Sequence, residues 1–200
     1  AFNGNVLDDP RMRLTIDDAK TFLKLAPRRY DVIISEPSNP WMAGIGALFT
    51  QEFYNDVDAA LAPDGLFVQW CHTYEITDEV VSLIARTLKD KFPHIYAFET
   101  RPYDLVLVAS RKPITPDYAA MKARLSEPVR RSLEKANAPT SLAGVLARQT
   151  LSPISVRGLA DIGAVSSDAR PILEFQAPFG FFQRKIARAC RGDDDAVRRI

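Results

Sequence analysis

The sequence predicts an α/β fold with a mostly parallel sheet and an antiparallel edge. Strand-like and helix-like segments alternate over residues 13–92, as in chains whose parallel strands are joined by crossover helices. The segment Tyr30–Ser35 is an almost unbroken apolar run, which is typical of a strand covered on both faces. The last two predicted strands, His94–Glu99 and Leu105–Ser110, are separated by a short turn without a helix, so we expect them to pair antiparallel.

The elements before residue 92 each have a local cause. Thr50 and Thr77 are suited to N-cap two helices, because apolar residues recur at helical spacing after each of them. The turn Ala62–Gly65 separates the first of these helices from a new strand. In chain order, the predicted elements are the strand Arg13–Ile16, a helix from Asp17 or Asp18 to about Leu25, the strand Tyr30–Ser35, the helix after Thr50, the strand Leu66–Trp70 and the helix after Thr77.

The second half of the chain predicts a C-terminal helical annex. We expect residues 1–112 to form the sheet domain, residues 113–183 to form the annex packed on the sheet, and residues 184–200 to form a basic, solvated tail. The annex is predicted to contain helices at Asp117–Ala136, Ser141–Thr150 and Ser155–Ile162, an extended segment at Pro171–Phe175 and a Phe-rich stretch at Ala177–Phe182.

Composition excludes several classes of protein. Apolar residues make up 46% and charged residues 26% of the chain, which argues against global disorder. A net charge of +1 gives no reason to expect nucleic acid as a partner. Cys71 and Cys190 have no partner motif, and His72 and His94 have no metal-ligand spacing, so we expect no disulfide scaffold and no metal site. Apolar runs fall far short of the ~20 residues of a membrane span, and we expect a cytoplasmic location.

Polar side chains follow three of the predicted strands. Ligands of open α/β sheets bind beyond the carboxyl ends of the parallel strands, so these side chains are candidates for a site. Polar residues also cap strands in sheets that bind nothing, and the pattern alone leaves both readings open. The polar groups are Asp17 and Asp18 after the first strand, Glu36 to Asn39 after the second, and Gln69 with His72 after the third.

Four segments carry a resemblance to a known family: Asp8–Leu23, Tyr30–Trp41, Leu48–Trp70 and Asp168–Phe175. In this order the chain resembles the C-terminal two-thirds of the spermidine synthase-like family, the aminopropyltransferases with the Rossmann-like class I S-adenosylmethionine-dependent methyltransferase fold. It is most similar to the bacterial members fused behind membrane-spanning segments. The resemblance implies a sheet of order 3-2-1-4-5-7-6 and a homodimer. It also implies a donor-binding part that is missing at the N-terminus, and a membrane-anchored parent chain.

The resemblance also implies roles for individual residues. Glu36 is the catalytic base that deprotonates the attacking amine, and the second carboxylate of the family is replaced by Asn39. The donor is S-adenosylmethionine or its decarboxylated form, bound once the N-terminal part is present. The donor-binding residues are Asp17, Asp18, Ala19, Glu36 and Pro37, and those that bind the acceptor amine are Asn39, Trp41, Gln69 and His72.

Three functions follow from these expectations. The first is transfer of an aminopropyl or related group from a nucleoside sulfonium donor to an amine. The second is S-adenosylmethionine-dependent methyl transfer to an acceptor that is not a diamine, since Asn39 carries no charge. The third is a non-catalytic domain that senses a nucleoside or polyamine, or that assembles with a membrane portion of the chain.

Overall fold

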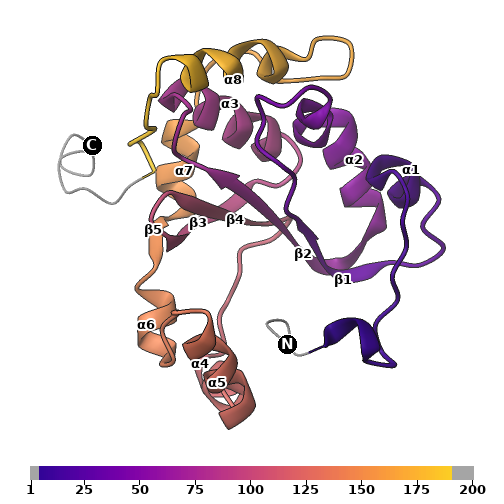
Figure 1. Cartoon of the computed structure of the whole chain (residues 1–200), viewed down its shortest axis with the longest axis vertical. Coiled ribbons are helices and arrows are strands. Elements are labelled where there is room, and N and C mark those ends of the chain that lie inside the picture. Colours follow the sequence, from indigo (N-terminus) through magenta and orange to yellow (C-terminus); the bar gives the residue numbers. More distant parts are fainter. Residues whose placement is uncertain (1–4, 191–200) are drawn as a thin grey trace.

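The computed structural model describes residues 5–190 as a five-stranded sheet with most helices on one of its faces (Figure 1). Along the sheet the strands follow the order β1-β2-β4-β3-β5. The strands are β1 (Tyr30–Ser35), β2 (Leu61–His72), β3 (His94–Arg101), β4 (Asp104–Ser110) and β5 (Gln149–Leu151). The helices are η1 (Val6–Asp8), α1 (Ala19–Lys24), η2 (Ile45–Phe49), α2 (Gln51–Ala60), α3 (Asp78–Lys89), α4 (Tyr118–Arg124), α5 (Glu127–Lys135), α6 (Leu142–Leu146), α7 (Pro153–Leu159) and α8 (Ile172–Phe182).

The sheet is mixed rather than mostly parallel. Strands β1 and β2 pair parallel, as expected for strands joined through α2. Strand β4 pairs antiparallel with both β2 and β3, which confirms the predicted hairpin, and β5 adds a third antiparallel pair. The order β1-β2-β4-β3 matches the 4-5-7-6 part of the expected sheet. Parallel pairs are in the minority among residues 5–190, because the hairpin and β5 supply three of the four pairings described.

The core lies between the sheet and the helices above it (Figure 1). Thr50 caps α2 and Thr77 caps α3, and the side chain of each threonine accepts a hydrogen bond from a backbone N–H in the first turn of its helix. Both helices then place apolar side chains against the strands. The largest buried side chains include Phe49, Tyr54, Phe67, Phe92, Ile84, Leu88, Ile95 and Leu105.

The N-terminal strand prediction is wrong. Residues 12–16 form no regular structure, and Leu14 and Ile16 are 65% and 92% exposed. A strand needs a neighbour for its backbone hydrogen bonds, and no described strand lies beside Arg13–Ile16. The helix that follows is confirmed, since α1 begins after Asp18, whose side chain accepts from the N–H of Thr21.

Three expectations for the annex are corrected. The predicted helix Asp117–Ala136 is broken at residues 125–126, because Pro128 has no N–H to donate and suits the first turn of a new helix, α5. The predicted helix Ser141–Thr150 consists of the short α6 followed by β5. Pro171–Phe175 is not extended, since α8 begins at Ile172 and continues through Pro178.

The annex also divides in space. Helices α7 and α8 contact α3 above the sheet, whereas α4, α5 and α6 lie together beyond its lower side (Figure 1). Residues 184–190 are not a solvated tail, because Ala187 and Cys190 are buried and the N–H of Ala187 donates to the carbonyl of Thr73. The rest of the predicted tail, residues 191–200, lies outside the described residues.

Candidate functional site

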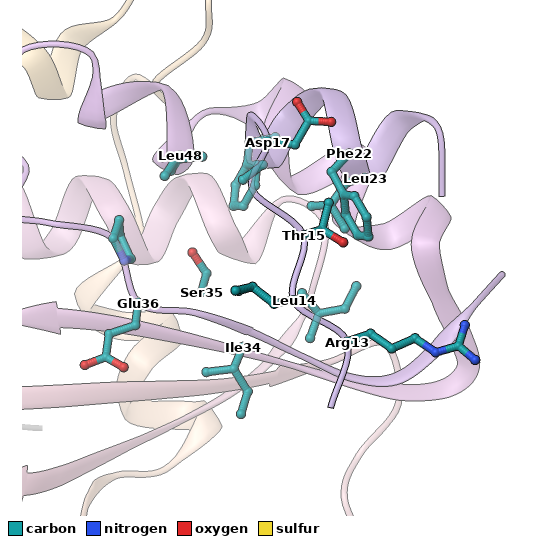
Figure 2. A pocket seen from close by; sticks show the side chains of 14 residues that line it. Arg13, Leu14, Thr15, Asp17, Phe22, Leu23, Ile34, Ser35, Glu36 and Leu48 are labelled. Atoms are coloured by element: carbon teal, nitrogen blue, oxygen red, sulfur yellow. The ribbon is translucent and has the colours of Figure 1, made fainter. Parts of the chain in front are cut away.

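A cavity of about 470 Å³ opens between the N-terminal segment, α1 and the end of β1 (Figure 2). Its size lies in the range of roughly 300–1,000 Å³ typical of small-molecule sites. Most of its lining side chains are apolar, and the polar ones are contributed by opposite walls. The lining residues are Arg13, Leu14, Thr15, Asp17, Ala19, Phe22, Leu23, Ile33, Ile34, Ser35, Glu36, Pro37, Leu48 and Phe53.

The two neighbouring aspartates of the α1 wall differ in position. Asp17 lines the cavity, and its carboxylate accepts the N–H of Asp18 at 2.8 Å. Asp18 does not line the cavity, because its carboxylate caps α1 by accepting the N–H of Thr21 at 2.8 Å. That backbone hydrogen bond holds the pKa of Asp18 below its usual value. Of this pair, Asp17 is therefore the carboxylate that a ligand in the cavity would meet.

Glu36 stands at the opposite wall, where β1 ends (Figure 2). Its side chain is exposed and turns with that of Ile34 to the face of β1 away from Ser35 and Leu48 (Figure 2). Glu36 and Ile34 also line a second hollow there, and Pro37 follows Glu36 in the lining of the first cavity. The strand ends here because Pro37 cannot donate to a ladder, and this places the Glu36 carboxylate at the carboxyl edge of the sheet. An exposed carboxylate in this place can accept a proton from a ligand.

Gln69 lies beneath this wall. Its side chain is fully buried, and its Nε2 donates to the carbonyl of Trp70 at 3.1 Å. Longer contacts of 3.4 Å join the same nitrogen to the carbonyl and hydroxyl of Ser35, which lines the cavity. Gln69 therefore supports the strand end from below and does not itself face the cavity.

A second group of predicted site residues lies apart from the cavity, in what we call the aromatic cluster: Trp41, Trp70, His72, Tyr74 and Phe181. The Trp41 ring packs edge-on against His72 with centroids 4.5 Å apart, and His72 lies 4.5 Å from Tyr74. Phe181 of α8 also packs against Trp41, with ring centroids 5.1 Å apart. None of these five residues lines the cavity at Asp17 and Glu36.

His72 and Asn39 give the aromatic cluster its chemical character. Burial lowers the pKa of His72 to about 4, so its imidazole is neutral at physiological pH. Neither ring nitrogen forms a hydrogen bond with any residue from 5 to 190. Asn39 points its amide at the cluster and donates to the hydroxyl of Tyr74 at 3.1 Å. The predicted acceptor-binding residues Asn39, Trp41 and His72 thus form a closed, uncharged group.

Two long-range contacts hold the loop of residues 36–50, which runs from the cavity past the aromatic cluster to α2. Glu174 of α8 accepts the N–H of Gly44 at 2.9 Å, and Gly44 has a φ of +83°, a conformation that suits glycine. Asp168 accepts Lys20 at 2.7 Å and the hydroxyl of Thr50 at 2.8 Å, which ties α1 to the start of α2. Burial raises the pKa of Asp168, but the bonds from Lys20 and Thr50 outweigh it and leave that pKa below its usual value.

Sequence reasoning missed several residues of the site. The sequence singles out neither the cavity walls Leu14, Thr15 and Phe22 nor Tyr74 of the aromatic cluster as site residues. Glu174 and Asp168 lie in a segment that carried the resemblance, but they were given no role. Their partners lie more than a hundred residues away in the chain, which local spacing cannot indicate.

Among residues 5–190 no three His, Cys, Asp or Glu side chains are grouped closely enough to hold a metal ion. No helix of the same residues combines the length and apolar character needed to cross a bilayer.

Comparisons with known proteins agree with the resemblance. Residues 1–104 match the spermine/spermidine synthase domain family. The polyamine aminopropyltransferase of Bacillus subtilis is 33% identical over 87 residues, which make up 44% of this chain and 31% of that protein. The polyamine aminopropyltransferase of a Synechococcus species is 36% identical over 116 residues, or 54% of this chain and 37% of the relative. The chain thus spans about a third of the length of the curated relatives it matches.

The fold agrees as well. The crystal structure of a probable spermidine synthase from Corynebacterium glutamicum superposes with a TM-score of 0.54 at 18% sequence identity. The match covers 80% of this chain and 55% of that one. At this identity the likeness concerns the fold, and it confirms the predicted α/β class.

Proposed function

The chain belongs to the spermine/spermidine synthase family, and on that premise we propose that it supplies the catalytic part of an aminopropyltransferase. The donor would be a nucleoside sulfonium, decarboxylated S-adenosylmethionine, and the acceptor an amine. The observation that carries the proposal is the cavity itself, a largely apolar space large enough for a nucleoside, with Asp17 in one wall and the end of β1 at Glu36 in the other.

The walls suit the two ends of such a donor. Phe22, Leu23 and Leu48 offer apolar surface to an adenine ring, and the Asp17 carboxylate can accept from its exocyclic amine. Ala19 leaves room beside the backbone for the ring, since its side chain is a single methyl group. Glu36 then stands at the end of β1, where the reacting carbon of the donor would be presented.

Glu36 provides the proton acceptor that the reaction needs. The acceptor amine is protonated at neutral pH and becomes a nucleophile only after it loses a proton. In the proposed step Glu36 takes this proton and the amine nitrogen forms a bond to the aminopropyl carbon. The carbon–sulfur bond of the donor breaks, and its electron pair leaves with the sulfur as a neutral thioether nucleoside. The cavity would contribute by holding the two reactants in line.

A second candidate is methyl transfer from S-adenosylmethionine, and the observation that favours it is the uncharged aromatic cluster. A diamine carries two positive charges, and loss of a carboxylate partner in a desolvated site costs about 2–5 kcal/mol. Asn39 bonds to Tyr74 and offers no charge. An acceptor with a single amine fits these side chains better than a diamine does.

Mass spectrometry of the reaction products separates the two candidates. The protein, in the chain length in which it is naturally expressed, is incubated with an amine panel and either S-adenosylmethionine or its decarboxylated form. The proposal predicts an aminopropylated amine with the decarboxylated donor alone. A methylated product with ordinary S-adenosylmethionine supports the second candidate, and donor binding without any product contradicts both.

A further inference from the structure

Helix α8 is apolar on two opposite faces, and one of them is exposed. Leu173, Ala177 and Gly180 recur at helical spacing and are buried against the molecule. The opposite face carries Phe175, Phe179 and Phe182, which are 70%, 64% and 79% exposed. Phenylalanine side chains of this exposure, aligned on one helix, are far outside the scatter of single apolar residues on ordinary surfaces.

The orientation of this helix is fixed by tight packing. A Cβ atom at Gly180 would lie 2.5 Å from the Cα of Ile76, so only glycine permits this approach. Glu174 binds the loop at Gly44, and Phe181 packs on Trp41. Helix α8 runs along the outside of the molecule, over α3 and away from the sheet (Figure 1). The three exposed rings therefore cannot turn inward without undocking the helix.

Basic side chains stand directly after the exposed rings. Arg184, Lys185 and Arg188 are exposed, and none forms an ion pair with another residue of the described chain. Residues 172–190 contain a single acid, Glu174, which is turned toward Gly44. Two acids of α3 lie nearby: Asp78 accepts the backbone N–H of Arg188 at 2.6 Å, and a hydrogen bond with Thr77, aided by the charge of Lys185, lowers the pKa of Glu79. We call Phe175, Phe179 and Phe182 with these three cations the α8 surface.

We propose that the α8 surface docks on an anionic lipid bilayer, with the three phenylalanine rings in the interface and the three cations at the headgroups. Aromatic rings on one helix face beside Lys and Arg are the combination that binds helices in the plane of a membrane surface. A second copy of the chain fits less well, because a twofold contact uses the same patch twice and would bring the two cation groups together. Docking also brings the Trp41 loop, which Phe181 contacts, close to the bilayer.

Co-sedimentation with vesicles tests the proposal. The 200-residue chain is mixed with vesicles of equal parts phosphatidylglycerol and phosphatidylcholine, and with vesicles of phosphatidylcholine alone. We expect binding to the mixed vesicles that weakens as salt is added, because salt screens the attraction between the three cations and the anionic headgroups. Each cation contributes about fivefold, so R184Q/K185Q/R188Q should bind roughly a hundredfold more weakly.

The aromatic part needs its own variant and a matched control. F175S/F179S/F182S should lose vesicle binding at least tenfold, and L25S/I154S, which changes two exposed apolar residues elsewhere, should bind like the wild type. All substituted side chains are exposed, so circular dichroism should show the wild-type melting curve for each variant. Equal binding by the serine variant and the wild type overturns the proposal. A different result would also overturn it: the wild type binds neither kind of vesicle, sediments as a dimer, and becomes a monomer in F175S/F179S/F182S.

Discussion

The cavity at Asp17 and Glu36 and the aromatic cluster lie at the same edge of one sheet, yet they differ in every physical property that matters to a ligand. The cavity is open, and its two carboxylates stand on exposed walls. The cluster is packed ring on ring, and burial keeps His72 neutral. One region can admit a ligand and exchange a proton with it, whereas the other is already filled by its own side chains.

The two regions are connected by the first part of one loop, residues 36–41. Residues 36–41 leave β1 with Glu36 at the cavity and enter the aromatic cluster with Trp41, five residues later. Pro37 and Pro40 stiffen the loop, and Glu174 binds it at Gly44. Under the proposed function, donor binding would fall on the cavity side of this loop, and the side chains that limit the choice of acceptor would fall on the cluster side. Four predictions test that division, from the largest expected effect to the smallest.

Glu36→Gln should abolish most of the proposed transfer while leaving donor binding nearly unchanged. A general base contributes about 10²–10⁴-fold in rate, and the amide cannot take the proton of the amine. The measurement is single-turnover product formation by mass spectrometry, with donor affinity from calorimetry. Glu134→Gln, at an exposed carboxylate of α5, is the matched control and should react like the wild type. An undiminished rate in Glu36→Gln would remove this residue from the mechanism.

His72 should make the stability of the protein depend on pH. Its pKa is about 4 in the folded protein, against about 6.5 in an unfolded chain, so the unfolded state binds more protons between these values. The free energy of unfolding should be level above pH 6.5 and fall by about 3 kcal/mol as the pH drops to 4.

Urea unfolding at a series of pH values measures this dependence. His72→Phe keeps a ring in the aromatic cluster and should flatten the part of the curve between pH 4 and 6.5. His94→Gln changes the other histidine of the chain and should leave the wild-type slope. A slope that survives in His72→Phe would mean that the imidazole is not held neutral by the cluster.

Asn39→Asp should shift acceptor preference toward diamines. The new carboxylate would stand beside Tyr74 and pair with the second ammonium group, a gain of about 2 kcal/mol or roughly thirtyfold in affinity. Initial rates with a diamine and with a monoamine of equal length give the ratio of the two KM values. Asn137→Asp, an exposed asparagine of the annex, controls for added negative charge. An unchanged ratio would show that the acceptor does not approach Asn39.

Asp17→Asn should weaken nucleoside binding about tenfold, since the cavity loses a charged hydrogen-bond acceptor. Asp18→Ala should leave binding unchanged and lower the melting temperature, because Asp18 caps α1 instead of facing the cavity. Calorimetry with methylthioadenosine and thermal unfolding of both variants separate the two roles. The reverse pattern would show that Asp18 is the aspartate that meets the ligand.

Local sequence signals predicted the middle of the fold well. The apolar run of β1 and the capping threonines of α2 and α3 determine their elements by short-range chemistry, and all three elements lie where expected. The expectation that β1 is covered on both faces is wrong, since Val32 and Ile34 are 49% and 69% exposed. The sequence predictions failed where residues distant in the chain determine which secondary structure a segment adopts. Arg13–Ile16 has strand-like residues but no neighbouring strand, and the apolar segment after Pro171 becomes helical because α8 packs along α3.

The candidate site shows the same limit. Asp17, Ala19, Glu36 and Pro37 were expected together and line one cavity, because strand ends in an α/β sheet meet at one edge. The separation of Asn39, Trp41 and His72 into a closed cluster depends on Phe181 and Tyr74, which spacing along the chain does not connect to them.

Hydrogen–deuterium exchange with and without methylthioadenosine tests most directly the claim that the cavity, and not the aromatic cluster, holds the donor. The account predicts slower exchange at residues 14–23 and 33–37, with no change at residues 70–74 of the cluster. Protection confined to residues 39–41 and 70–74, with the cavity walls unchanged, would contradict it.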